Sequence, residues 1–201
     1  MSFFKRETVS ALTIAAALFA QTEAAQACAC CTDPGQRFET NGPMDEYIRG
    51  ELALMRFGPT ALLYSSPGFP DDVLGIVKPS TDPYRVRAAI LGTVSFDIVD
   101  PAGHTGRIQF ATPRAISRFE VDPRADLGPS PPNGPNLYKE WRLSGPAKLS
   151  GVAAGAGTFA TATLILHGSG NSCSSSIDFK RWTLSVKGKG VEFTFLGDMK
   201  P

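Results

Sequence analysis

The C-terminal stretch of the chain, residues 182–195, reads WTLSVKGKGVEFTF. Apolar residues occupy every second position in its two halves, 182–186 and 191–195, so each half has one apolar face. A period of two is typical of half-buried β-strands. The link 187–190 alternates lysine with glycine and predicts a tight turn. The stretch is therefore expected to be an antiparallel β-hairpin, and the rest of the chain repeats its pattern.

The same alternation recurs upstream. Residues 93–111 predict a second hairpin, because two alternating segments flank the turn-forming sequence DPAG at 100–103. Other short strands are predicted near Tyr84, at Phe119 and Val121, at Trp141 and Leu143, and over 159–166. Together the segments predict an all-β, single-domain antiparallel β-sandwich or β-barrel of about 7–8 strands. The periodicity does not choose between sandwich and barrel.

One short helix is predicted near residues 45–57. Asp45 is placed to cap its start, and Gly58-Pro59 is placed to stop it. The alternative is that the second half of this segment begins a strand that continues into Leu62 and its neighbours.

The N-terminus has the features of an export signal. Lys5 and Arg6 precede an apolar stretch over 9–20, and the small-residue sequence Ala-Gln-Ala ends at residue 27. The apolar stretch is shorter than the roughly 20 residues that a membrane-spanning helix needs, and no later segment is longer. We therefore expect a signal peptide at 1–27, a mature β-domain at 28–201, a periplasmic or secreted location and no transmembrane span.

A cysteine follows the cleavage site directly, as lipoprotein processing requires. Ala25, however, stands where such proteins usually carry leucine or another branched apolar residue. Ordinary cleavage is the favoured interpretation. The alternative is a lipid anchor on Cys28 that tethers the chain to a membrane.

The charge and composition restrict the class of protein further. The 201 residues carry a formal net charge of +1, which gives no basis for nucleic-acid binding. The 20 glycines and 16 prolines show no period, so they favour many turns over a collagen-like structure. Segment 123–136 contains five prolines and is predicted to be an exposed loop.

All four cysteines lie in the predicted mature chain: Cys28, Cys30, Cys31 and Cys173. An even number of cysteines in an exported protein is typical of disulfide bonds. Adjacent cysteines bridge each other only with strain, so Cys30 and Cys31 are expected to take different partners. The connectivity stays open.

The alternative role for these four cysteines is metal binding. Three thiols within four residues suit a soft ion such as Cu(I), or zinc, with Cys173 as a further ligand. His104 is predicted in a turn and His167 on a strand, and each is interpreted as an ordinary residue. Disulfides are the favoured interpretation, with no cofactor; copper is the alternative.

No catalytic residue is assigned from the sequence. No serine stands in a G-x-S-x-G motif, and no histidine and carboxylate are brought to a serine by local spacing. Trp141 and Trp182 are interpreted as core residues, with a ligand cavity as the alternative. An enzyme of unknown class is thus the least favoured reading of this chain.

Several segments together carry a resemblance. They are the Cys-x-Cys-Cys start, Arg56-Phe57-Gly58-Pro59, and Gly170-Asn171-x-Cys173 followed by Phe179-x-x-Trp182-x-Leu184. In these segments the chain resembles a group of uncharacterised exported bacterial proteins. The resemblance implies export and a single domain, and names no activity. The predicted function is a non-catalytic binding or structural role in the periplasm, in a β-domain stapled by disulfides.

Overall fold

The computed structural model describes residues 37–65, 73–121, 138–154, 160–170 and 175–200. Within these residues the chain is mostly β-structure, with one α-helix and one 3₁₀ turn. In chain order the elements are β1 (Arg37–Pro43), α1 (Glu46–Leu54), β2 (Phe57–Tyr64), β3 (Tyr84–Ile90), β4 (Thr93–Val99), β5 (Thr105–Ala111), β6 (Ala115–Val121), β7 (Tyr138–Gly151), β8 (Ala160–Ser169), η4 (Ser176–Asp178), β9 (Phe179–Gly188) and β10 (Val191–Met199).

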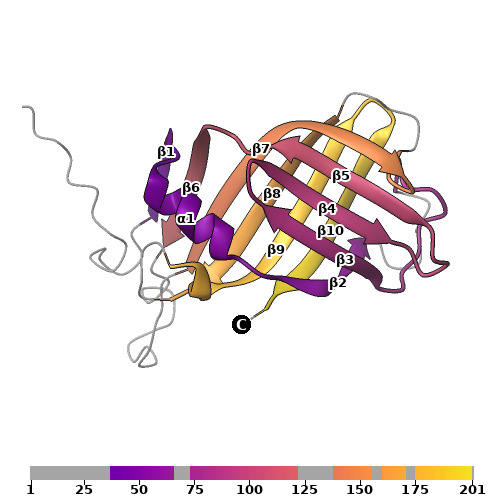
Figure 1. Cartoon of the computed structure of the whole chain (residues 1–201), viewed down its shortest axis with the longest axis horizontal. Helices are drawn as coiled ribbons and strands as arrows, with labels where there is room; N and C mark the ends of the chain where they lie inside the picture. Colours follow the sequence, from indigo (N-terminus) through magenta and orange to yellow (C-terminus); the bar gives the residue numbers. More distant parts are fainter. Residues whose placement is uncertain (1–36, 66–72, 122–137, 155–159, 171–174, 201) are drawn as a thin grey trace, which may run out of the picture.

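Eight of these strands close into an antiparallel β-barrel (Figure 1). Around the barrel the order is β7, β5, β4, β3, β2, β10, β9 and β8, and β8 pairs back with β7 along 138–147. The predicted all-β fold is confirmed, including the hairpins β4–β5 and β9–β10. The closing ladder between β7 and β8 makes the fold a barrel and not a sandwich.

The long strand β7 connects the barrel to a short two-stranded extension, the wing, which consists of β1 and β6. One edge of β7 pairs with β8, while its other edge pairs with β6 over 138–142 and with β5 over 147–151. β1 pairs with β6, so the two strands extend from one end of the barrel beside α1 (Figure 1). β1 was not among the predicted strands, because its sequence RFETNGP does not alternate. Its ladder with β6 holds it in a strand.

Side chains fill the interior of the barrel. Alternate residues of each strand point inward and are buried, as the sequence period predicts. Both tryptophans belong to this core, which confirms their interpretation, with Trp141 and Trp182 at most 1% exposed. Phe96 packs against Trp182 with ring centroids 5.0 Å apart. An eight-stranded barrel is just wide enough for such side chains, so ligand sites are to be sought on its outside.

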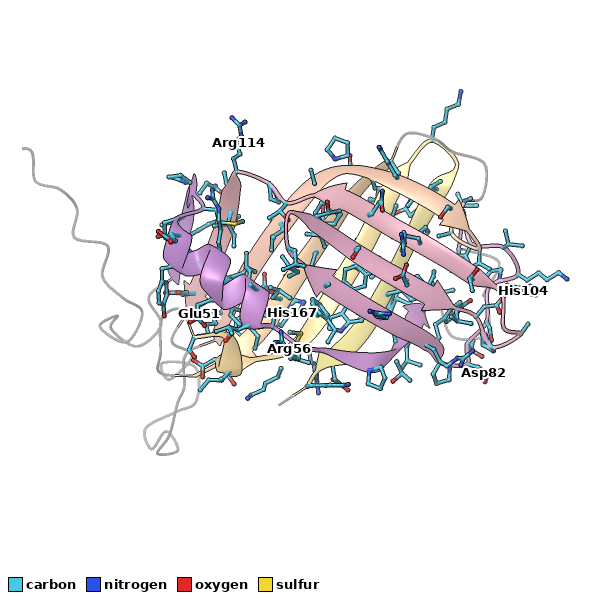
Figure 2. All side chains as sticks on the ribbon, in the orientation of Figure 1. Glu51, Arg56, Asp82, His104, Arg114 and His167 are labelled. Carbon is cyan, nitrogen blue, oxygen red and sulfur yellow. The ribbon has the colours of Figure 1, made fainter. Side chains whose placement is uncertain are left out.

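The helix α1 covers one end of the barrel with its apolar face. Asp45 caps it by accepting a hydrogen bond from the backbone N–H of Ile48 at 2.7 Å, as the sequence predicts. Ile48 and Leu52 are buried. On its polar side, Glu51 accepts a hydrogen bond from the backbone N–H of Ser176 in η4 at 2.5 Å (Figure 2). No helix in the described ranges is long and apolar enough to cross a membrane.

The helix is shorter than the sequence predicts. It ends at Leu54, because Met55 already has an extended backbone with ψ of 138°. Phe57 then starts β2, where it pairs with Met199 and is buried. Both sequence readings of 45–57 are therefore partly right: the first half is helical and the end of the segment enters a strand.

Candidate functional site

A groove of about 680 Å³ crosses the outer face of the barrel. It lies over β2, β10, β9, β8 and the start of β7, on the side of the strands that faces away from the packed interior. The residues that determine its character are Leu62, His167, Arg181, Thr183, Leu196 and Gly197. This outer groove lies within the size range of small-molecule sites, which is roughly 300–1,000 Å³.

The floor of the outer groove forms where Gly197 meets Trp182. The two residues are paired across β9 and β10. A Cβ atom on Gly197 would lie only 2.4 Å from the indole ring, so only glycine lets the ring lie there. The indole N–H donates to the backbone carbonyl of Asp198 at 3.2 Å. A register shift in the β10–β2 ladder follows at 197–199, and it interrupts the regular outer face at the same place.

One wall of the outer groove is apolar. Leu62 of β2 and Leu196 of β10 are direct cross-strand partners and point outward. Leu62 is 50% exposed and Leu196 is 38% exposed, so both present apolar surface to the solvent. Such a pair is suited to contact the apolar part of a ligand.

The opposite wall carries a hydrogen-bonded network centred on His167. The hydroxyl of Tyr138 donates to Glu140 Oε1 at 2.6 Å. Burial, together with this hydrogen bond and the negative charge of Glu140, raises the pKa of Tyr138 above its ordinary value. The phenol therefore stays protonated and acts as a donor.

His167 has a hydrogen-bonding partner at each of its two ring nitrogens. Nδ1 of His167 lies 3.1 Å from Glu140 Oε1, which as a carboxylate oxygen only accepts, so we assign the ring proton to Nδ1. Nε2 lies 2.9 Å from Thr183 Oγ1, whose hydroxyl group can donate to this nitrogen or accept from it.

The order Thr183, His167, Glu140 is also that of a nucleophile, a base and an orienting carboxylate. Acyl transfer further needs donors aimed at the developing oxyanion. Thr183 is paired with Ile165 on one side and Leu196 on the other, so the backbone in this region is engaged in the ladders of β9. Arg181 is the exposed cation in the described wall, with a side chain 80% exposed and 3.9 Å from Asp198. The hydrogen-bonding groups of this wall are therefore better suited to recognising a polar ligand than to acyl transfer.

His104 lies far from the groove, in the predicted turn between β4 and β5 (Figure 2). Its Nδ1 is 2.9 Å from Asp100, whose carboxylate also accepts from the backbone N–H of His104 at 2.8 Å. Burial raises the pKa of Asp100, but the hydrogen bonds from His104 outweigh it, and the net pKa is below the ordinary value. This pair shapes the turn.

The cysteines predicted as disulfide or metal residues lie outside the described residues: Cys28, Cys30, Cys31 and Cys173. The Pro-rich segment 123–136 also lies outside them. In the part of the chain that the structure describes, no group of three or more His, Cys, Asp or Glu side chains could hold a metal ion.

The sequence placed His167 on a strand correctly but gave no reason to group it with Tyr138, Glu140 and Thr183. Glu140 and His167 are 27 residues apart and become direct partners only through the β7–β8 register. Thr183 is a diagonal neighbour across β8 and β9. Only the pairing of three strands brings these side chains together.

The outer groove and the His167 network are thus the described features with the most recognition chemistry. Comparisons of the chain with protein-family models, with curated proteins and with solved structures found no match.

Proposed function

We propose that this chain is an exported binding protein that holds a small amphipathic ligand in the outer groove. The single observation that carries the proposal is the pairing of an exposed apolar wall, Leu62 and Leu196, with the hydrogen-bonded wall around His167. The filled barrel interior supports an external site over an internal one. The engaged backbone beside Thr183 favours binding over acyl-transfer catalysis.

The groove chemistry defines the class of ligand. Leu62 and Leu196 favour an apolar body. Arg181 offers guanidinium donors at the other side, where a carboxylate or sulfonate would be recognised. A ligand with an aromatic or aliphatic body and one anionic group therefore fits both walls.

The fluorescent sulfonate 1-anilinonaphthalene-8-sulfonate has this chemistry and serves as the probe. We expect the folded protein to enhance its fluorescence, and Leu62→Asp to weaken its affinity about tenfold, which is about 1.4 kcal/mol. The substitution removes apolar contact and puts a negative charge beside the sulfonate. A fluorescence titration at constant ionic strength measures the effect.

Leu74→Asp is the matched control. Leu74 is 51% exposed, against 50% for Leu62, and is not among the residues that line the groove. The control should bind the probe as the unchanged protein does. Equal binding by both variants, or equal loss in both, would contradict the assignment of the site to the outer groove.

Export and disulfide formation are part of the same proposal. We expect the protein recovered from the periplasm to begin at Cys28 and to contain two disulfides, so no thiol should react with an alkylating reagent until the protein is reduced. Intact mass measurement with and without reduction tests this. Bound copper with alkylatable thiols would favour the metal-binding alternative, and a diacylglycerol adduct on Cys28 would show a lipid anchor in place of a free chain.

A further inference from the structure

A lysine with no exposed surface lies at the end of the barrel, where the wing joins it. Lys139 of β7 is 0% exposed, and its Nζ lies 2.7 Å from Oδ2 of Asp178 in η4. The Asp178 side chain is only 16% exposed. The His167 network and the groove do not use either residue, so this pair is a separate chemical feature.

The backbone is shaped to seat the carboxylate of Asp178. A Cβ atom at Gly170 would lie 2.2 Å from the carboxylate carbon, and one at Gly168 would lie 2.6 Å from the backbone oxygen of Asp178. Glycine at both positions therefore leaves room for η4 to pack closely, with the Asp178 carboxylate against Lys139. The close approach of Nζ and the carboxyl group is built into the fold.

An aromatic ring packs beside the lysine of this pair. Nζ of Lys139 lies 5.3 Å from the ring centroid of Phe179, and that ring packs against Trp141 at 4.9 Å. In so buried a setting two opposite charges lose much of their hydration, and their attraction repays this only in part. A reaction that joins the two groups into a neutral product would remove both charges and with them this desolvation cost.

A buried carboxyl group lies on the neighbouring strand. Glu120 of β6 is directly opposite Lys139 in the ladder, and it is only 6% exposed. Directly opposed residues of an antiparallel pair place their side chains on the same face. Glu120 is therefore positioned to carry a proton for a reaction of Lys139.

We propose that Lys139 and Asp178 become joined by an amide bond between their side chains. The ammonium of Lys139 first gives a proton to the Asp178 carboxylate, which leaves a neutral amine and a carboxylic acid. The nitrogen lone pair attacks Cγ of Asp178, and the bond from Cγ to the hydroxyl oxygen breaks. Glu120 passes a proton from the nitrogen to the departing hydroxyl, which leaves as water, and Glu120 ends as it began.

The step needs no oxidant and no other reactant. One ammonium and one carboxylate become one amide and one water molecule, so charge and atoms balance. Holding the two groups in contact replaces an encounter between separate molecules. The product cross-links β7 to the segment that leads into β9, and fixes η4 at the end of the barrel.

Mass spectrometry of the full chain, purified and reduced, tests the proposal. The expected mass is lower than that of the reduced sequence by one water. Trypsin should not cleave after Lys139, and it should release peptide 125–142 covalently joined to peptide 149–180. Cleavage after Lys139, with peptides 125–139 and 149–180 recovered separately and the chain at its full sequence mass, would overturn the proposal.

Lys139→Arg is the matched variant. It keeps a positive charge opposite Asp178 but cannot form the amide, so its mass should show no loss of water. Cyclisation of Asp178 with its own backbone would also release water, but that loss would persist in Lys139→Arg and would not join two peptides. Asp178→Asn should form the same cross-link with loss of ammonia. If a variant does not fold, the peptide map of the unchanged protein decides by itself.

Discussion

Replacing Trp182 with alanine should lower the free energy of unfolding by about 3–5 kcal/mol, the range for truncating a buried tryptophan. The ring is 1% exposed and contacts Phe57 and Phe96, with centroids 5.9 and 5.0 Å away. The variant also loses the hydrogen bond to the carbonyl of Asp198. Because small domains are stable by only about 5–15 kcal/mol, the loss is a large share of the total.

Urea unfolding followed by circular dichroism measures the effect. Tyr64→Ala is the control, since Tyr64 lies on β2 of the same barrel but is 65% exposed. It should change stability by about 0.5 kcal/mol or less. Similar losses in the two variants would mean that Trp182 is not the packing centre inferred from its contacts.

Gly151→Ala should destabilise the fold by about 2–5 kcal/mol. Gly151 ends β7 with φ of 60°, and a Cβ atom there would lie 2.0 Å from the backbone oxygen of Thr105. Since that oxygen belongs to β5, relief of the clash has to separate two strands of the barrel. Left-handed strain adds to the cost of the clash.

Gly103→Ala separates these two contributions. Gly103 has φ of 93°, but a Cβ atom there would meet nothing within 4 Å. It should therefore cost only the backbone strain, roughly 1–2 kcal/mol. Thermal and urea unfolding of both variants give the comparison. If Gly151→Ala were as stable as Gly103→Ala, the close approach of β5 to Gly151 would be contradicted.

Much of the barrel follows from local sequence because its strands alternate buried and exposed residues. Segment 182–195 and the hairpin over 93–111 form where the pattern predicts them. β1 was not predicted, because its sequence does not alternate. It is a strand because it pairs with β6. The barrel closes through the β7–β8 ladder. A period of two identifies strands but does not show which strands pair, so the sequence does not predict this contact.

The buried lysine did leave a signal in the sequence. Lys139 stands two residues before Trp141, so strand periodicity puts both on the inner face. Because lysine is usually exposed, its inward position alone did not predict that Lys139 is buried. The His167 network left none, because Tyr138, Glu140 and Thr183 meet His167 only through the register of β7, β8 and β9.

The two indole N–H signals in a ¹H–¹⁵N spectrum give the most direct test of where the protein binds its ligand. Both indole rings are buried, but Trp182 lies beneath Gly197 and lines the floor of the outer groove, whereas Trp141 is not among the residues that line it. During titration with 1-anilinonaphthalene-8-sulfonate, the Trp182 signal should shift and the Trp141 signal should stay in place. A shift of Trp141 alone, or of neither signal at a saturating probe concentration, would contradict a binding site in the outer groove.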